Sequence, residues 1–420
     1  MNIDTNKKIA IVGTGISGLV TAYLLAPDND IHIYESNDYI GGHTNTESLQ
    51  TKGHKYNIDT GFIVFNDRNY PNFTKLLRKI NIKSQPAPMT FSVSCDETGL
   101  EYNGTSLNGL FSQRINLFRM SFHKMLFDIY RFNNDAKKFL KNDNELDLSF
   151  SNFLQRGKYG NKIRDFYIYP MASSIWSEDP DKIANAPFHF FARFFENHGM
   201  LNINDRPQWR VIQGGSQEYV KKLTADFKNR IRLNCPVRNI RRENNNVKIQ
   251  SSNKEETFDY VIIATHSDQA LSLLSDPTKK EKDILGNINY QKNEVLLHRD
   301  SSVLPKNKRA WASWNYHKTR NKLSHACVTY NMNMLQSIES DETFCVSLNY
   351  KNNIDPSKII KSIDYDHPII SREAINAQLR HHEINGANKT FYCGAYWGNG
   401  FHEDGVNSAL TITKQFGKVL

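Results

Sequence analysis

Ile9-Ala-Ile-Val-Gly13-Thr-Gly15-Ile-Ser-Gly18-Leu-Val-Thr-Ala-Tyr-Leu-Leu25 is the stretch of sequence that decides the fold. An apolar run of strand length leads into three glycines with the spacing Gly-x-Gly-x-x-Gly, and an apolar segment with helical periodicity follows them. A second apolar strand, Ile31-His-Ile-Tyr, then ends at Glu35. This order of strand, glycine turn, helix, strand and acid predicts a dinucleotide site. A glycine-rich turn in an unrelated α/β fold is the alternative.

Each glycine of the motif has a separate role in such a site. Gly13 allows a tight turn, Gly15 lets a pyrophosphate approach the backbone, and Gly18 lets the helix pack close to the strand. The phosphates then meet free N–H groups at the helix N-terminus, where the helix dipole favours negative charge. Glu35 lies 22 positions after Gly13, where its carboxylate can accept hydrogen bonds from a ribose diol. The cofactor-binding residues predicted from this region are Gly13, Thr14, Gly15, Ile16, Ser17, Gly18, Glu35 and Ser36.

The composition limits the class of protein. With 420 residues the chain is longer than one hydrophobic core usually serves, and its 39% hydrophobic and 23% charged residues are typical of globular proteins in water. The N-terminus does not resemble a signal peptide, and no apolar run approaches the ~18 residues that span a bilayer. The five cysteines are scattered and include no Cys-x-x-Cys pair. This usage argues against a disulfide framework or a metal site and favours the reducing cytoplasm.

The formal net charge of +9 points to an anionic partner. Because no nucleic-acid-binding module is recognisable, an anionic membrane surface is favoured over nucleic acid. A lysine- and asparagine-rich genome composition would explain the same charge without any partner. The sequence leaves both explanations open.

Two further motifs follow the acid. Gly41-Gly42-His43-Thr44 lets the backbone pass beside a cofactor larger than NAD, and Asp59-Thr-Gly61-Phe-Ile63 reads as a strand that enters a turn. In this order the motifs resemble the flavin-containing amine oxidase superfamily, which includes monoamine oxidases, protoporphyrinogen oxidase and carotenoid desaturases. The resemblance implies an α/β fold: a Rossmann-like FAD-binding domain of the amine oxidase/glutathione reductase type, with a second α+β substrate domain of mixed sheet and helices.

The resemblance also implies where the domains and the cofactor lie. The FAD-binding domain would comprise residues 1–75, 205–290 and 386–420, and the substrate-binding domain residues 76–204 and 291–385. The glycine pair would lie near the flavin diphosphate and the Asp-x-Gly strand near the isoalloxazine, while the last helix would point N–H groups at the flavin edge that becomes negative on reduction. The further cofactor-binding residues that the resemblance implies are Gly41, Gly42, His43, Thr44, Gly61, Phe62, Ile63, Val237, Ala264, Thr265, Gly394, Asp404, Gly405 and Val406.

Two departures from the superfamily pattern bear on the cofactor. Ala395 occupies the place where amine oxidases usually have an acid for the ribityl chain, so Asp404 or the backbone must substitute. Cys393 lies on the last strand itself and is no counterpart of the cysteine that binds flavin covalently in monoamine oxidases. We therefore expect non-covalent FAD.

Residues 111–140 carry apolar side chains at alternating steps of three and four, which predicts a long amphipathic helix or a helix pair. The polar side of this helix is basic and carries Arg114, Arg119, Lys124, Arg131, Lys137, Lys138 and Lys141. The helix is either a surface helix of the substrate domain or a face that docks on anionic lipid.

The aromatic-rich stretches 166–176 and 187–195 form either core or the wall of an apolar tunnel. Residues 291–385 predict a second, antiparallel sheet.

Flavin enzymes of this kind need a substrate C–H bond held in a dry pocket and few protein acids or bases. His402 and Glu403, on the loop that enters the last helix, are the best polar catalytic candidates. His402 either shuttles a proton or caps the helix. Tyr396 and Trp397 either wall the substrate site or pack in the core. The predicted catalytic residues are therefore His402, Glu403, Tyr396 and Trp397.

Several stretches, among them Asn197-His-Gly-Met-Leu201 and Gly394-Ala-Tyr-Trp-Gly398, resemble a bacterial subgroup of predicted NAD/FAD-binding oxidoreductases associated with cyclopropane fatty-acid synthase. This resemblance implies an FAD-dependent oxidase or desaturase that abstracts hydride from an unsaturated, methylated or cyclopropane-type fatty acyl chain, in the cytoplasm or at the inner face of the membrane. Three alternatives stay open: a flavin amine oxidase, an FAD-dependent double-bond isomerase, and a flavin-binding accessory partner of a lipid methyltransferase.

Overall fold

Strands from both ends of the chain meet in one parallel sheet in the computed structural model, which describes residues 3–141, 147–176, 179–202, 204–243, 245–252, 254–320 and 326–420. The strand order is β10-β2-β1-β14-β20, and every neighbouring pair is parallel. Ile9, Ile11 and Ile262 are fully buried, as expected for a parallel sheet that is covered on both faces. The strands are β1 (Lys8–Val12), β2 (Asp30–Tyr34), β10 (Ile231–Arg232), β14 (Tyr260–Ile263) and β20 (Thr390–Tyr392).

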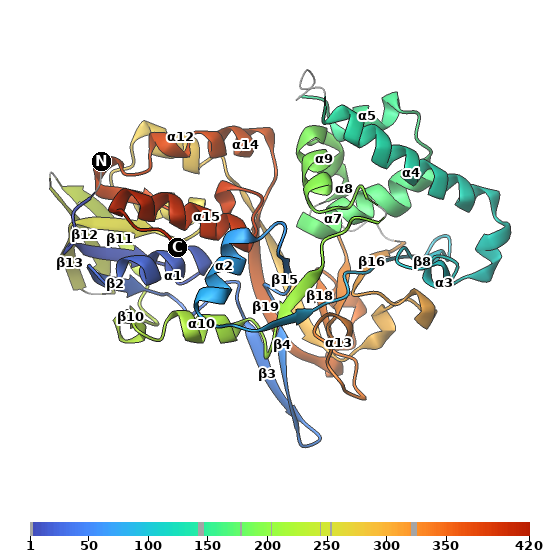
Figure 1. Ribbon diagram of the computed structural model, residues 1–420, viewed down its shortest axis with the longest axis horizontal. Helices are drawn as coiled ribbons and strands as arrows, with labels where there is room; N and C mark the ends of the chain where they lie inside the picture. Colours follow the sequence, from blue (N-terminus) through green and yellow to red (C-terminus); the bar gives the residue numbers. More distant parts are fainter. Residues whose placement is uncertain are drawn as a thin grey trace. The chain divides into compact units, whose positions relative to one another are not determined.

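Two helices that are almost 400 residues apart in sequence lie side by side against this sheet (Figure 1). They are α1 (Ile16–Leu25) and α15 (His402–Thr413). Gly405 makes the approach possible, because a Cβ atom there would lie 2.7 Å from Cγ2 of Ile16. Two more helices pack on this pair, α2 (Pro71–Lys79) on α15 and α10 (Gln217–Leu223) on α1. Pro71 occupies the first position of α2, where its missing N–H removes no hydrogen bond from the helix.

A three-stranded antiparallel sheet and a hairpin complete the strands around the parallel sheet. The sheet has the order β11-β12-β13, and the hairpin pairs β3 with β4. The helices α11 (Ser267–Leu273), α12 (Lys279–Leu285) and α14 (Arg372–Leu379) belong to the same part of the chain. The strand bounds are Val237–Glu243 for β11, Asn246–Ser251 for β12, Lys254–Phe258 for β13, Thr46–Thr51 for β3 and His54–Asp59 for β4.

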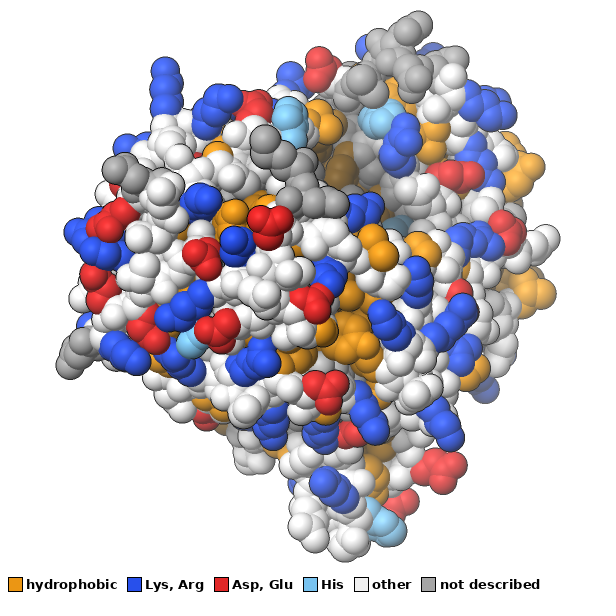
Figure 2. Space-filling model, turned by 60° about the vertical axis from the view of Figure 1, so that its left-hand side comes forward, with side chains coloured by type: hydrophobic (Ala, Val, Ile, Leu, Met, Phe, Trp, Pro, Cys, Tyr) orange, Lys and Arg blue, Asp and Glu red, His pale blue; other side chains and the backbone are white. Residues whose placement is uncertain are grey.

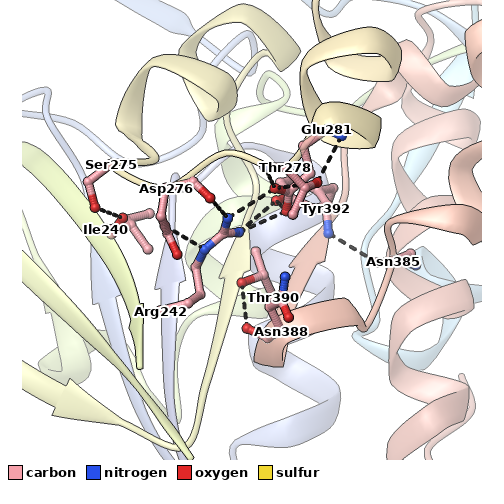
Figure 3. Close-up of polar contacts among 10 residues, drawn as sticks. All are labelled: Ile240, Arg242, Ser275, Asp276, Thr278, Glu281, Asn385, Asn388, Thr390 and Tyr392. Atoms are coloured by element: carbon pink, nitrogen blue, oxygen red, sulfur yellow. Dashed lines mark hydrogen bonds and ion pairs between the residues drawn. The ribbon is translucent and has the colours of Figure 1, made fainter. Parts of the chain in front are cut away.

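A buried polar cluster ties β11, α12 and β20 together (Figure 3). The Arg242 guanidinium donates to both carboxylate oxygens of Glu281, at 2.8 and 3.0 Å, and the Tyr392 hydroxyl donates to the same carboxylate at 2.5 Å. Burial alone would raise the pKa of the Glu281 carboxyl, but its hydrogen bonds from Arg242, Tyr392 and Thr278 outweigh burial and hold this pKa below its ordinary value. The cluster therefore fixes the strand that leads into the last loop and helix.

The remaining part of the chain is built on a seven-stranded sheet with the order β19-β15-β18-β17-β16-β7-β8. Its pairs β15–β18, β18–β17 and β17–β16 are antiparallel, as predicted for residues 291–385. β7 pairs antiparallel with β8 and parallel with β16. β7 lies outside the segment for which the antiparallel sheet was predicted, and it can pair parallel with β16 because the two strands are far apart in sequence and no hairpin forces them to reverse direction. The strands are β7 (Phe91–Cys95), β8 (Glu101–Asn103), β15 (Tyr290–His298), β16 (Trp314–Lys318), β17 (Val328–Asn331), β18 (Cys345–Leu348) and β19 (Ile359–Pro368).

A group of helices rich in aromatic side chains belongs to the same part. Phe153 and Phe188 stack at 3.7 Å with an angle of 15° between their rings, and Phe132, Phe150 and Phe191 are fully or almost fully buried. The aromatic residues of the predicted 187–195 stretch thus contribute to core packing. The helices are α3 (Leu107–Leu110), α4 (Met120–Phe139), α5 (Phe150–Arg156), α6 (Asn161–Ile163), α7 (Tyr169–Trp176), α8 (Pro180–Asn185), α9 (Phe188–Asn197) and α13 (Met332–Leu335).

The predicted helix or helix pair of residues 111–140 consists of a short 3₁₀ helix, Arg114–Phe118, followed by α4. Arg119, with extended backbone angles (φ −92°, ψ 101°), separates the two. Phe122, Met125 and Phe132 face the core as the periodicity predicts, but Ile115 and Phe118 are exposed. The prediction that these two belong to the buried face was wrong, because one helical period cannot continue across a break in the helix.

The chain divides into two compact units, unit 1 with Met1–Gln85, Ile212–Gln291 and Pro368–Leu420, and unit 2 with Pro86–Val211 and Lys292–His367. The predicted domain boundaries followed residues 75, 204, 290 and 385. The last boundary differs most, because α14 belongs to unit 1. Its Gln378 donates to the carbonyl oxygens of Tyr396 and Gly398, at 2.9 and 2.7 Å. The chain also forms three short strands, β5 (Phe65–Asn66), β6 (Ser84–Pro86) and β9 (Trp209–Ile212).

No helix in the described ranges combines the length and the apolar character needed to cross a bilayer.

Candidate functional site

The glycine turn after β1 lies at the carboxyl edge of the parallel sheet. The Gly13 N–H donates to the carbonyl of Tyr34 at 2.8 Å, and Gly13 has φ +105°. A Cβ atom on Gly13 would lie 2.7 Å from the carbonyl oxygen of Ala264, and one on Gly18 would lie 2.2 Å from the carbonyl oxygen of Gly13. Packing against the neighbouring backbone therefore requires glycine at these two positions.

Gly15 differs from the other two glycines because the space beside it is open. A Cβ atom on Gly15 would meet nothing within 4 Å, and no side chain of the described residues caps the N-terminus of α1 at Gly15. The second glycine pair lies directly beside Gly15, because a Cβ atom on Gly42 would lie 3.1 Å from Cα of Gly15. Two bare backbone segments and a helix N-terminus thus form a cradle for an anion such as the diphosphate of FAD.

Glu35 holds the cradle in shape. Its carboxylate accepts hydrogen bonds from the backbone N–H and the hydroxyl of Thr14, at 3.0 and 2.5 Å, and from the N–H of Asn37 at 2.9 Å. The N–H of Gly41 in turn donates to the Thr14 hydroxyl at 3.3 Å. Glu35 is buried, whereas Ser36 is exposed. The binding of a ribose diol by Glu35 stays a prediction.

Three further residues that the resemblance implies for cofactor binding, Val237, Ala264 and Thr265, lie at the same sheet edge. The N–H of Cys235 donates to the carbonyl of Glu35 at 2.8 Å, which brings the start of β11 and Val237 to this edge. The N–H of Ala264 donates to the carbonyl of Val12 at 2.8 Å, so Ala264 and Thr265 directly follow the end of β14. Tertiary structure therefore brings these residues to the glycine cradle.

His402 is buried in a cage of side chains from four segments of unit 1. Its ring stacks on Phe62 at 3.5 Å with an angle of 14°, and its Nε2 atom is hydrogen-bonded to Thr44 and to Tyr219, each at 3.0 Å. Burial lowers the pKa of the His402 imidazole to about 3. The ring is therefore neutral near pH 7. Its hydrogen bonds go to two side-chain hydroxyls, whereas Asp404 caps the helix, and the role of His402 in proton transfer stays a prediction.

Glu403 and Asp404 are bound by backbone groups. The Glu403 carboxylate accepts from the N–H groups of Asn72 and Phe73, at 3.0 and 2.8 Å, and so caps the N-terminus of α2. Asp404 accepts from the N–H of Phe401 at 2.9 Å and caps its own helix. Burial raises the pKa of both carboxyls, that of Asp404 to about 6. The following residues Gly405 and Val406 are buried against α1, where Gly405 touches Ile16 and Ser17.

Tyr396 and Trp397 pack against the core of unit 1. The Tyr396 ring covers Gly394, where a Cβ atom would lie 2.2 Å from Cε1 of Tyr396. Trp397 stacks on His381 at 3.9 Å. These contacts agree with the packing alternative, and a role of either ring in the substrate site stays a prediction.

Sequence reasoning named the Asp59-Thr-Gly motif but did not list Asp59 as a site residue. Asp59 is completely buried, and its Oδ1 atom accepts from the N–H and the hydroxyl of Ser216, both at 2.8 Å, and from the hydroxyl of Thr46. Burial raises the pKa of Asp59 to about 6. Asp59 thereby joins the Gly214–Gly215 turn to the strand that leads to Phe62, whose N–H donates to the carbonyl of His43 at 2.8 Å. The sequence signal that could have identified Asp59 as a site residue is its position directly before Thr60 and Gly61.

Cys393, the cysteine closest in sequence to the last loop, is completely buried beside Thr21. Burial raises the pKa of this thiol to about 12, so it is neither accessible nor ionised at neutral pH. This environment agrees with a flavin that is not attached to Cys393.

Comparison with known proteins identifies the family. Residues 16–323 match the model of the family "flavin containing amine oxidoreductase", and no curated protein sequence matches the chain. The fold is similar to a CLA-producing fatty acid isomerase from P. acnes (TM-score 0.70, 16% identity, 98% of this chain and 99% of that chain covered). It is also similar to a putative protoporphyrinogen oxidase from Exiguobacterium sp. 255-15 (TM-score 0.69, 17% identity, 98% and 99% covered) and to cyclohexylamine oxidase from Brevibacterium oxydans IH-35A (TM-score 0.68, 13% identity, 98% and 100% covered).

The family match covers most of the chain, and the glycine cradle fits the diphosphate of a flavin dinucleotide. The chain therefore belongs to the flavin-containing amine oxidoreductase family and is an oxidoreductase with FAD as its cofactor.

Proposed function

We propose that the substrate of this flavin enzyme is hydrophobic, and that it is an unsaturated, methylated or cyclopropane-type fatty acyl chain. The observation that carries this proposal is that the three titratable side chains at the start of α15 are all engaged in hydrogen bonds within the protein. His402 is bonded to Thr44 and Tyr219, while Glu403 and Asp404 bind backbone N–H groups. Chemistry that removes hydride from a C–H bond does not need a free acid or base at that place.

Bound FAD would supply a two-electron oxidant for the hydride of a substrate C–H bond, and a C=C bond would form with the proton of the neighbouring carbon passing to solvent. The chain positions the cofactor through the open space at Gly15, the N-terminus of α1 and the carbonyl-lined turn at Gly13. The N-terminus of α15 lies beside that of α1 and contributes its helix dipole to the same region. The cofactor-binding roles predicted for Phe62, Ile63, Gly394, Asp404, Gly405 and Val406 are part of this proposal.

The acyl substrate has two sources of support beside the site. The fold is similar to an enzyme described as a CLA-producing fatty acid isomerase. The stretches Asn197–Leu201 and Gly394–Gly398 resemble the subgroup associated with cyclopropane fatty-acid synthase. Together they favour a lipid-derived substrate over a water-soluble one.

Anaerobic reduction of the flavin tests the substrate class. The FAD-loaded protein is mixed without oxygen with dispersed unsaturated, methylated and cyclopropane-containing phospholipids and fatty acids, and with a panel of primary amines. Bleaching of the flavin absorbance by an acyl compound supports the proposal. Bleaching by amines alone would instead identify an amine oxidase, the activity named for cyclohexylamine oxidase among the similar structures. Admission of oxygen afterwards shows whether oxygen accepts the electrons.

Two further alternatives have distinct results in the same experiment. A double-bond isomerase, which the similarity to a fatty acid isomerase favours, changes the acyl chain without net bleaching, and the product is visible by gas chromatography. A flavin-binding accessory partner of a lipid methyltransferase leaves every compound unchanged and co-purifies with such an enzyme.

We also propose that the protein meets its substrate at the inner face of an anionic membrane, in agreement with the net charge of +9.

A further inference from the structure

Exposed apolar side chains are concentrated in one short stretch of unit 2. Ten large hydrophobic side chains of the described residues are exposed, and seven of them lie between Leu107 and Tyr130. Phe118 and Met120 are the most exposed, at 83% and 81% of their surface. Such a concentration on a protein surface marks a contact with a partner or a membrane. The seven residues are Leu107, Ile115, Leu117, Phe118, Met120, Phe127 and Tyr130.

Short contacts join the elements that carry these side chains. The ring of His123 in α4 is hydrogen-bonded through Nε2 to the carbonyl of Leu117 at 2.8 Å. Arg114 donates to the carbonyl of Phe111 at 2.7 Å and to the side chain of Asn108 at 2.6 Å. The helix α3, the 3₁₀ helix Arg114–Phe118 and the first turns of α4 therefore form one continuous surface.

The geometry of α4 explains why the apolar side chains are not used in the core. Phe122, Met125 and Phe132 already fill the buried face. Met120 and Phe127 lie seven positions apart on the opposite face, with Lys124 between them, because an α-helix repeats every 3.6 residues. Exposed apolar side chains thus recur along α4 at Met120, Phe127 and Tyr130.

The charge of this surface has one sign. Between Gly104 and Arg131 the only acidic residue is Asp128, which is buried and paired with Arg131 at 3.0 Å. Neighbouring elements add cations: Lys162 donates to the Ser121 hydroxyl at 2.8 Å, and the 3₁₀ helix Lys308–Ala310 packs against α3. On the face of the molecule shown in Figure 2, by contrast, basic and acidic side chains are intermixed. The exposed or half-exposed basic residues of the stretch are Arg114, Arg119, Lys124 and Arg131.

We propose that this surface, residues 107–131, docks on an anionic lipid bilayer. Phe118, Met120 and Phe127 enter the boundary between headgroups and acyl chains, while Arg119 and Lys124 contact anionic headgroups. Apolar side chains beside uncompensated cations match the two layers of a bilayer surface, whereas a protein partner would have to supply both an apolar pocket and a ring of acids. The proposal sharpens the membrane association proposed above, and rests on the proposed function only where it makes the bilayer the source of the substrate.

Vesicle co-sedimentation of the FAD-loaded protein tests the proposal without any turnover. We expect binding to vesicles that contain phosphatidylglycerol, release by added salt, and at least tenfold weaker binding to vesicles of phosphatidylcholine alone. The variant Phe118→Ser/Met120→Ser/Phe127→Ser and the variant Arg119→Glu/Lys124→Glu are each expected to lower the affinity for the anionic vesicles at least tenfold. All five side chains are exposed, so flavin content and melting temperature should match the wild type.

Matched changes in unit 1 are the controls. Leu379→Ser/Val419→Ser removes two equally exposed apolar side chains, and Lys279→Glu/Lys282→Glu makes the same change in charge on α12. Both should bind the anionic vesicles like the wild type. Loss of binding in these controls to the same degree, or equal binding of the wild type to both kinds of vesicle, would overturn the proposal.

A gain of signal provides an independent test. In Phe118→Trp, brominated phospholipids in anionic vesicles should quench the new indole, while the tryptophans of the wild type show less quenching. Absence of additional quenching despite binding would contradict insertion at Phe118.

If the wild type instead forms dimers that the triple serine variant abolishes, and does not bind vesicles, the surface is an interface between two copies and the proposal is wrong. Failure of every substrate in the flavin assay would leave vesicle binding unaffected, so the two proposals can fail separately.

Discussion

The guanidinium of Arg242 lies 2.8 Å from the carboxylate of Glu281, and both side chains are almost completely buried, at 4% and 1% exposure. The pair joins β11 to α12, and through the Tyr392 hydroxyl it also holds β20, which leads into the last loop of the site. Removal of one buried charge leaves the other without its partner, which costs much more than the loss of an exposed pair.

Arg242→Met should therefore destabilise the FAD-loaded protein by about 3–5 kcal/mol in urea unfolding followed by tryptophan fluorescence. Arg241→Met, the next residue on the same strand with an exposed partner Glu243, is the control and should cost less than about 1 kcal/mol. The double variant Arg242→Met/Glu281→Leu should be more stable than Arg242→Met alone. An equal loss of unfolding free energy in Arg241→Met would show that the buried pair does not stabilise the protein more than the exposed pair.

Gly15→Ala tests the diphosphate cradle. The new Cβ atom meets no protein atom within 4 Å, and the extended backbone of Gly15 tolerates alanine, so folding should be unaffected. The methyl group nevertheless occupies the open space where the diphosphate binds, and we expect FAD to bind at least tenfold more weakly in equilibrium dialysis, which is about 1.4 kcal/mol. Gly104→Ala, also with open space around it but in unit 2, is the control. Unchanged FAD affinity of Gly15→Ala would place the diphosphate elsewhere.

His402→Phe separates a positioning role from proton transfer. The substitution keeps a ring against Phe62 and removes the hydrogen bonds to Thr44 and Tyr219, whose hydroxyl groups remain bonded to each other at 2.5 Å. We expect a loss of about 1–3 kcal/mol in stability. The pH profile of flavin reduction, measured with the compound that reduces the wild type, should keep its shape. Disappearance of a step between pH 5 and 8 in the variant would identify His402 as the proton shuttle instead.

Asp59 makes the stability depend on pH. Burial raises its pKa in the folded protein to about 6 from the ordinary value of 3.8, so between these values the folded state binds more protons than the unfolded state. Stability contributed by protonated Asp59 is complete below pH 3.8 and decreases as the pH rises through 6, by roughly 3 kcal/mol in total.

Asp59→Asn should remove this part of the slope in urea unfolding measured from pH 4 to 7. The half-buried Asp404, with its pKa raised to about 6, should retain a similar part. Asp67→Asn, which neutralises an exposed carboxyl of unit 1, is the control for the loss of one charge. An identical slope in Asp59→Asn and the wild type would contradict the raised pKa of Asp59.

Acid precipitation tests the mode of flavin attachment. The buried and protonated thiol of Cys393 predicts non-covalent FAD, so trichloroacetic acid should leave the yellow colour in the supernatant. Flavin absorbance that stays with the protein pellet would contradict this.

Local sequence patterns predicted the elements that depend on neighbouring residues. The turn at Gly13 was predictable because glycine is required by the backbone angle and the close approach, and its spacing is fixed over six residues. The buried face of α4 followed the 3.6-residue repeat, but the exposure of Phe118 did not, because the helix breaks at Arg119.

The sequence by itself determined the dinucleotide turn, the flavin family and the order of the elements, since each is encoded in contiguous residues. Only the tertiary structure decided the state of the titratable groups. The bond between Tyr219 and His402 joins residues 183 positions apart, and that between Asp59 and Ser216 joins residues 157 positions apart. Burial among distant partners sets the pKa of His402 and Asp59, and no local pattern carries that information, because desolvation depends on everything that packs around a group.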